Sequence, residues 1–188
     1  MNKPLLLWGG TDVGSSYYGQ RPHRFANMPE VNRDRIEFAA VNNYINDGIP
    51  VIGVFRGGQL LCVANGGSLW QHSEKHVRSH SIMCNKLDGS FDKTIESVAA
   101  GHHQIMNPSG KYIVLGWAGF ETTVYDEYDI PKQLSDTPEV VWWPDTNCLA
   151  VQPHPEWMIS NHPFNIWIDD IIKELFGIHN YFKEIIRA

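Results

Sequence analysis

PVIGVFRGGQLLCVANGGSLWQ, residues 50–71, is the stretch that decides the fold of this chain. Residues 51–55 are apolar and β-favouring, Arg56-Gly57-Gly58 is a break of mostly small residues, and the apolar residues within 60–64 are typical of a helix. This order predicts a buried strand, a tight turn and a helix. Such a turn pushes one side chain out over the edge of the sheet.

The residue at the corner of this turn is Phe55. Gly53 and Gly57 lie two positions before and two after it, which is the spacing of a nucleophile elbow. Small flanking residues are needed there because the backbone folds back on itself. A working elbow carries Ser or Cys at the corner, whereas Phe has no nucleophilic atom. We therefore expect that ordinary nucleophilic catalysis does not start from residue 55.

The segments before the elbow predict an α/β fold. Residues 5–8 are typical of a buried strand that ends at Gly9-Gly10, and the apolar spacing within 31–46 predicts a helix that stops at Gly48. Together with the strand at 51–55 they make a βαβ unit. We therefore expect one domain over residues 1–188, with a mostly parallel sheet and helices on both of its faces.

The second half of the chain predicts further strands and a long helix. Glycine, aspartate and proline turns separate the β-like segments, and a Pro-Asp-Thr-Asn turn signals a hairpin. We interpret residues 121–137 as an acidic surface loop. The expected strands are 80–84, 94–98, 112–117, 139–143 and 149–152, and the expected helix is 163–176.

Composition limits the function classes. The 188 residues carry a net charge of −6, with 43% hydrophobic and 19% charged residues, and the basic residues are scattered. Nucleic acid and anionic membrane are therefore poor partners. The three cysteines show no C-x-x-C spacing, and no apolar run approaches the length of a membrane span. These features predict a cytoplasmic protein without a cofactor.

A second segment that carries chemistry is Val151-Gln152-Pro153-His154-Pro155-Glu156. Its prolines favour extended chain, in which residues i and i+2 face the same side, so His154 and Glu156 should project together. A carboxylate beside an imidazole fixes its tautomer and stabilises its protonated form. Alone, a paired surface His and Glu would explain this pattern equally well. With an elbow upstream, it indicates the base and the orienting acid of a catalytic triad.

The sequence resembles the class I glutamine amidotransferase superfamily, and is most similar to its γ-glutamyl peptidase branch, which includes the γ-glutamyl-γ-aminobutyrate hydrolases. The resemblance covers nearly the whole chain, and the motifs follow the order of the family. They are Gly9-Gly10-Thr11-Asp12-Val13, Tyr18-Gly19, Arg33-Asp34, residues 50–71, Ser79-His80, Gly101-His102-His103-Gln104 and residues 151–157.

This resemblance implies a role for each matched position of the site. Phe55 stands where the family has its catalytic cysteine, His154 would be the base of that cysteine, and Glu156 would orient the base. The backbone N–H groups of Gly10 and Arg56 would form the oxyanion hole, each donor contributing about 3–4 kcal/mol in comparable sites.

The resemblance also implies a flavodoxin-like fold and a substrate pocket lined by Gln59 and His102. Relatives carry a strand-helix-strand portion before the strand that ends in Gly9-Gly10, so this chain would be shortened at its N-terminus. A shortened sheet would leave an edge or a face less covered, which favours a protein partner or a homo-oligomer there. The ligand implied is a small γ-glutamyl or amide compound.

Other nucleophiles and a metal are less well supported. Cys62 lies seven residues into the elbow helix, Cys84 lies in a separate expected strand, and Cys148 comes six residues before His154, so we interpret all three as small buried hydrophobes. The spacing of His72, His76 and His80 would suit a metal only on a helix, and Ser73 and Ser79 favour a loop. We therefore expect no metal.

Three functional hypotheses remain open. The first is an amidotransferase-like pseudoenzyme with a binding, regulatory or scaffold role. The alternative is a hydrolase or amidotransferase that acts on a γ-glutamyl or related amide by a noncanonical route, for example through water activated by His154. The third treats Phe55 as an engineered or incidental substitution in an otherwise ordinary enzyme.

Overall fold

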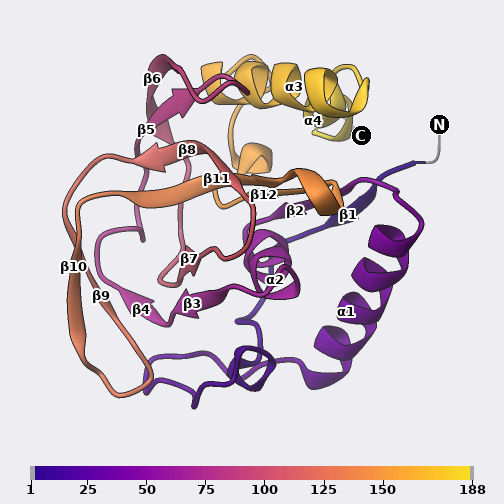
Figure 1. Ribbon diagram of the computed structural model, residues 1–188. Coiled ribbons are helices and arrows are strands. Elements are labelled where there is room, and N and C mark those ends of the chain that lie inside the picture. The colour runs from indigo at the N-terminus through magenta and orange to yellow at the C-terminus, as the bar shows by residue number, and fades with distance from the viewer. Residues whose placement is uncertain (1–2, 187–188) are drawn as a thin grey trace.

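A computed structural model describes residues 3–186 (Figure 1). The helices are α1 (Val31–Asn46), α2 (Arg56–Ala64), α3 (Pro163–Phe176) and α4 (Tyr181–Ile185), with short 3-10 turns at Ser15–Tyr18, Pro144–Thr146 and Pro155–Trp157. The strands are β1 (Leu5–Leu7), β2 (Val51–Val54), β3 (Ser68–Trp70), β4 (His72–Ser73), β5 (His80–Asn85), β6 (Phe91–Val98), β7 (Ile105–Asn107), β8 (Ile113–Ala118), β9 (Thr122–Tyr125), β10 (Pro131–Leu134), β11 (Thr137–Trp143) and β12 (Cys148–Val151).

A seven-stranded sheet in the order β1-β2-β12-β11-β8-β5-β6 forms the centre of the molecule. Strands β1, β2 and β12 pair in parallel, whereas the pairings from β12 to β6 are antiparallel. Two of these pairings have a local reason, because β11–β12 and β5–β6 are hairpins and hairpin strands can pair only antiparallel. Most strands still share one direction, but parallel pairing is limited to the three strands beside the elbow.

Helices cover both faces of this sheet, as expected for the α/β fold, which is confirmed (Figure 1). Val51 and Ala150 face α1 and α2, while Ile52 and Leu149 face α3 and α4. Neighbouring residues alternate between the two core clusters because successive side chains of a strand point to opposite faces. Strands β2 and β12 are buried throughout, so the elbow that follows β2 has a rigid base.

One predicted segment was wrong. Residues 121–137, expected to form an acidic surface loop, contain the hairpin of β9 and β10. Threonine, valine and tyrosine in 122–125 alternate between buried and partly buried positions, while the acidic residues gather in the turn at 126–129. The acidic turn therefore obscured the strand pattern on either side of it. Within residues 3–186, no helix has the length and apolar character needed to cross a membrane.

Candidate active site

The elbow has the strained geometry that its sequence predicts. Phe55 adopts φ 53° and ψ −112°, a conformation rare for residues with a side chain. Its N–H donates to the Val151 carbonyl at 2.7 Å, and its carbonyl accepts from the Gln59 N–H at 3.1 Å. The last parallel strand and the first turn of α2 therefore fix the corner from both sides.

The flanking glycines are required by close backbone contacts. A Cβ atom on Gly53 would lie 2.3 Å from the Gly57 carbonyl oxygen. A Cβ atom on Gly57 would lie 2.4 Å from the Leu7 carbonyl oxygen. Real Cβ atoms do not approach so closely, so the elbow, the helix and β1 can pack together only with glycine at both positions.

His154 and Glu156 form the predicted pair. The His154 Nδ1 and a Glu156 carboxylate oxygen lie 2.7 Å apart, and the His154 N–H donates to the Ala99 carbonyl at 3.0 Å. The other ring nitrogen of His154, Nε2, is buried and makes no hydrogen bond within the described part of the chain. The imidazole thus has one nitrogen oriented by a carboxylate and the second free, as a triad base requires.

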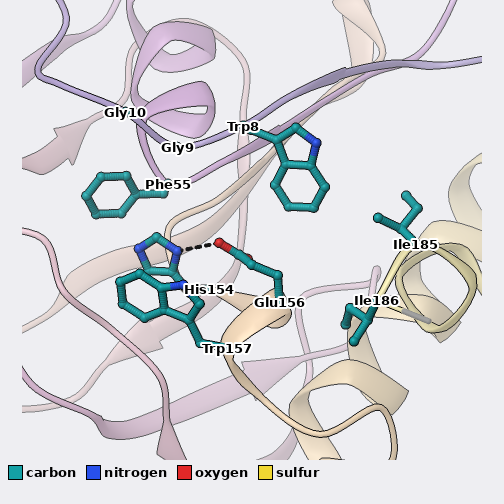
Figure 2. A pocket seen from close by; sticks show the side chains of 9 residues that line it. All are labelled: Trp8, Gly9, Gly10, Phe55, His154, Glu156, Trp157, Ile185 and Ile186. Carbon is teal, nitrogen blue, oxygen red and sulfur yellow. Dashed lines mark hydrogen bonds and ion pairs between the residues drawn. The ribbon is translucent and has the colours of Figure 1, made fainter. Parts of the chain in front are cut away.

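Two aromatic rings enclose that imidazole, as Figure 2 shows. The Phe55 ring lies on one side, with its centroid 4.4 Å from that of His154 and the planes inclined by 33°. Trp157 stacks on the other side at 3.6 Å and 5°. The imidazole is therefore held between aromatic faces and shielded from water.

A cavity of about 600 Å³ opens beside these rings (Figure 2). Its walls are mostly apolar. Among the described residues that line it, Glu156 carries a carboxylate and none is a lysine or an arginine. The residues that line it are Trp8, Gly9, Gly10, Phe55, His154, Glu156, Trp157, Ile185 and Ile186.

Of the two expected oxyanion-hole residues, Gly10 lines this cavity and Arg56 opens α2 directly after the corner. The first N–H groups of a helix lack partners within the helix, so the Arg56 N–H is a suitable donor. The oxyanion hole itself remains a prediction. The Arg56 side chain does not line this cavity: it is fully buried and forms ion pairs with Asp34 and Glu37 of α1.

Arg33 and Asp34, one of the motifs that carry the resemblance, lie near the start of α1 and contact the loop that follows β1. Arg33 donates to the Gly9 carbonyl at 2.9 Å, and Asp34 accepts from the Gly14 N–H at 3.0 Å. These charges therefore hold the Gly9-Gly10 loop and the elbow against α1. Sequence reasoning missed this network because Arg56 and Asp34 are 22 positions apart in the chain.

Gln59 and His102 lie away from the cavity. Gln59 is buried, and its side-chain amide donates to the Gln104 carbonyl and the Gln152 side chain, each at 3.4 Å. His102 is also buried, with Nε2 3.5 Å from the Glu139 carboxylate. Neither contributes to the cavity lining. Their role in binding substrate therefore remains a prediction without support from this cavity.

The three cysteines occupy the core. Burial raises the pKa of Cys62 and Cys84 to about 12 and also raises the pKa of Cys148. Cys148 pairs with Val51 at the start of β2, whereas Phe55 follows the end of that strand. Cys148 therefore lies at the start of β12, whereas His154 follows the end of that strand.

The histidine series divides in the fold. His72 lies against His23 and Phe25, whereas His76 and His80 meet His102 and Glu139. The spacing of His72, His76 and His80 does not bring all three together, because β4 and the loop after it are not helical. No local sequence pattern indicates that Glu139 joins these histidines, since it belongs to the distant strand β11.

The fold is that of solved glutamine amidotransferase-type proteins. A provisionally named GMP synthase component of Thermoplasma acidophilum matches with a TM-score of 0.55 and 17% identity, covering 98% of this chain and 76% of the other. A glutamine amidotransferase of Thermotoga maritima matches with a TM-score of 0.50 and 13% identity, over 85% of this chain and 64% of the other. These two comparisons show that the chain has the α/β fold of such proteins.

The chain belongs to the Peptidase C26 family, which matches residues 3–118. A provisionally named glutamine amidotransferase of Mycobacterium tuberculosis is 29% identical over 171 residues, which cover 81% of this chain and 50% of that protein. A provisionally named glutamine amidotransferase-like protein of Lactococcus lactis subsp. cremoris is 35% identical over 123 residues, 57% of this chain and 65% of that protein. The chain thus spans about half the length of the first relative and about two thirds of the second.

Proposed function

We propose that this chain is a catalytically inactive glutamine amidotransferase-like protein, in which Phe55 replaces the nucleophile and the remaining site serves binding. The observation that carries the proposal is the contact between the Phe55 and His154 rings, whose centroids lie 4.4 Å apart. An attacking sulfur would have to stand at this corner, within hydrogen-bond reach of His154 Nε2. A benzyl side chain supplies neither a nucleophile nor a proton for that base.

None of the three cysteines is placed to act as the nucleophile that residue 55 lacks. The thiolate is the reactive form of cysteine, and burial keeps the pKa values of Cys62 and Cys84 near 12. Cys148 lies at the far end of the β2–β12 pair. A route through one of these thiols would require the core to open.

Water activated by His154 is the second candidate, and the intact pair of His154 with Glu156 favours it. A general base must reach the proton that it removes, directly or through one water molecule. Because Nε2 is buried beside the Phe55 ring, water can reach it only if a neighbouring side chain moves. The inactive protein is therefore the better supported of the two.

The γ-glutamyl peptidase resemblance suggests an amide ligand, and the cavity supports one with a large apolar substituent. Trp8, Trp157 and Ile185 offer apolar contact area. A γ-glutamyl group carries an α-carboxylate, and the described cavity residues include no cation to pair with it. We therefore propose that the apolar substituent contributes most of the affinity.

Release of ammonia or amine from glutamine and a panel of γ-glutamyl amides tests this proposal. The unmodified protein should release no more than its His154→Ala variant under the same conditions. Turnover by the unmodified protein that disappears in His154→Ala would overturn the inactive assignment and establish the water route. Ligand binding is measured separately, by the tryptophan fluorescence change on titration with amides of increasing apolar size.

A further inference from the structure

A second cluster of functional groups lies away from the elbow, among segments that are distant in the sequence. Three histidines and one glutamate, His76, His80, His102 and Glu139, each place one ligand atom within 4.8 Å of the others. His76 precedes β5, His80 opens it, His102 lies between β6 and β7, and Glu139 belongs to β11. We propose that this cluster is a zinc site.

Burial and missing hydrogen bonds distinguish this cluster from a surface group. His76 and Glu139 are fully buried, and the side chains of His102 and His80 are 1% and 9% exposed. Within residues 3–186, His76 Nδ1, His102 Nε2 and Glu139 Oε2 make no hydrogen bond of good geometry, and the two nitrogens lie at ion-pair distances of 3.0 and 3.5 Å from the Glu139 carboxylate. Buried polar atoms without partners are costly, and a cation among them would satisfy all three together.

The distances around the carboxylate suit tetrahedral coordination. Glu139 Oε1 lies 3.0 Å from His76 Nδ1 and 3.3 Å from His80 Nε2, and Oε2 lies 3.5 Å from His102 Nε2. Zinc bonds of about 2.0–2.1 Å in a tetrahedron separate neighbouring ligand atoms by roughly 3.3 Å. The four ligand atoms lie within 4.8 Å of one another, so the side chains would have to draw closer around a bound ion.

The outer nitrogen of each histidine is already held by an acceptor. His102 Nδ1 is 2.9 Å from the Gln104 carbonyl, His80 Nδ1 is 3.1 Å from the Arg78 carbonyl, and His76 Nε2 is 3.2 Å from the Thr137 hydroxyl. Histidines that ligate metals characteristically use their second nitrogen in this way, which fixes the tautomer and aims the first nitrogen at the metal. All three rings here direct their other nitrogen toward Glu139, and that of His80 is hydrogen-bonded to it at 3.3 Å.

The ligand set indicates zinc in a structural role. Three imidazoles and a carboxylate suit zinc better than calcium or magnesium, which prefer oxygen ligands. Four protein ligands leave no open position for a substrate. Phe120 packs on the His76 and His80 rings, with centroids 5.0 and 5.4 Å away, and so covers the site.

A bound zinc would also restrict the motion of a segment that contacts the elbow pocket. The segment that carries His102 begins at Ala99, whose carbonyl accepts the His154 N–H at 3.0 Å. Gly101 of the same segment lies against the Trp157 ring. Metal at His102 would therefore fix the backbone that holds His154 and Trp157.

Metal content and cobalt substitution test the proposal. The full chain, treated with a chelator and then with excess zinc, should retain about one zinc per chain after desalting. With cobalt(II) in place of zinc, it should show the intense visible absorption of tetrahedral cobalt. Retention of less than about a tenth of an equivalent, or an octahedral cobalt spectrum, would overturn the proposal.

Variants locate the metal within the chain. His102→Gln and Glu139→Gln should each lower zinc affinity at least tenfold, and Thr137→Val should lower it by about 10–100-fold as the partner of a ligand. His103→Gln, which alters the neighbouring histidine outside the cluster, should bind zinc like the unmodified chain. Equal losses in His102→Gln and His103→Gln would contradict this site. If the ligand variants do not fold, the metal content and cobalt spectrum of the unmodified chain decide.

Discussion

Phe55 keeps the backbone of a nucleophile elbow without a nucleophile. Its positive φ of 53° costs on the order of 1–3 kcal/mol, and the surrounding strands and helix must supply that energy. His154 next to it keeps both the orienting carboxylate and an unpartnered nitrogen. At the scale of single residues, the site therefore has the geometry expected of a base and its orienting acid, beside a residue without a nucleophilic atom.

The native cysteines should be inert in the folded protein. With a pKa near 12, only about one thiol in a hundred thousand is ionised at neutral pH, and Cys62 and Cys84 are in addition fully buried. Labelling with a disulfide reagent should therefore modify none of the three until denaturant is added. Rapid labelling of any of them in the native state would reopen the search for a substitute nucleophile.

At the scale of elements, the elbow depends on the contact between α2 and β1. Gly57→Ala places a Cβ atom 2.4 Å from the Leu7 carbonyl oxygen, so we expect a loss of about 3 kcal/mol in the free energy of unfolding. Gly58→Ala is the matched control, because its Cβ would meet no atom closer than 3.2 Å and alanine favours a helix.

Urea unfolding measures both variants. The control should change the free energy of unfolding by no more than about 1 kcal/mol. Equal losses in the two variants would show that helix composition, and not the contact with β1, limits stability.

The elbow also depends on the ion pairs between α2 and α1. Arg56→Met would leave the buried Asp34 carboxylate without its cation, and breaking a buried pair on one side costs about 3–5 kcal/mol. Adding Asp34→Asn to this variant removes the isolated charge, so the double variant should recover part of the loss.

A thermodynamic cycle from urea unfolding of the single and double variants gives the coupling energy of the pair. Additive losses, without any recovery, would show that Arg56 contributes through packing of its side chain alone.

For the whole molecule, the two core clusters lie on opposite faces of one sheet. Because β2 and β12 contribute alternate residues to both clusters, loss of either face should disrupt the other. Unfolding followed by tryptophan fluorescence and by far-ultraviolet circular dichroism should therefore give one coincident transition. Two separated transitions would contradict the expectation of a single domain.

The sequence predicted the parts of this molecule whose signals are local. Glycine spacing around Phe55 identified the elbow, and the i, i+2 spacing of His154 and Glu156 identified their pairing. The contacts of Arg56 with Asp34, and of Glu139 with three histidines, depend on how separate elements meet, and no local pattern records them. For the same reason, sequence reasoning could not place Gln59 and His102 relative to the cavity.

The most direct test of the central claim is the alkylation rate of the introduced thiol in Phe55→Cys. If the rest of the triad is intact, His154 should lower the pKa of that thiol. Iodoacetamide should then modify it at neutral pH at least about tenfold faster than the native cysteines, and His154→Ala in the same background should remove most of the difference. A rate no faster than that of the buried native cysteines would contradict the account, because His154 would then be unable to activate a nucleophile at residue 55.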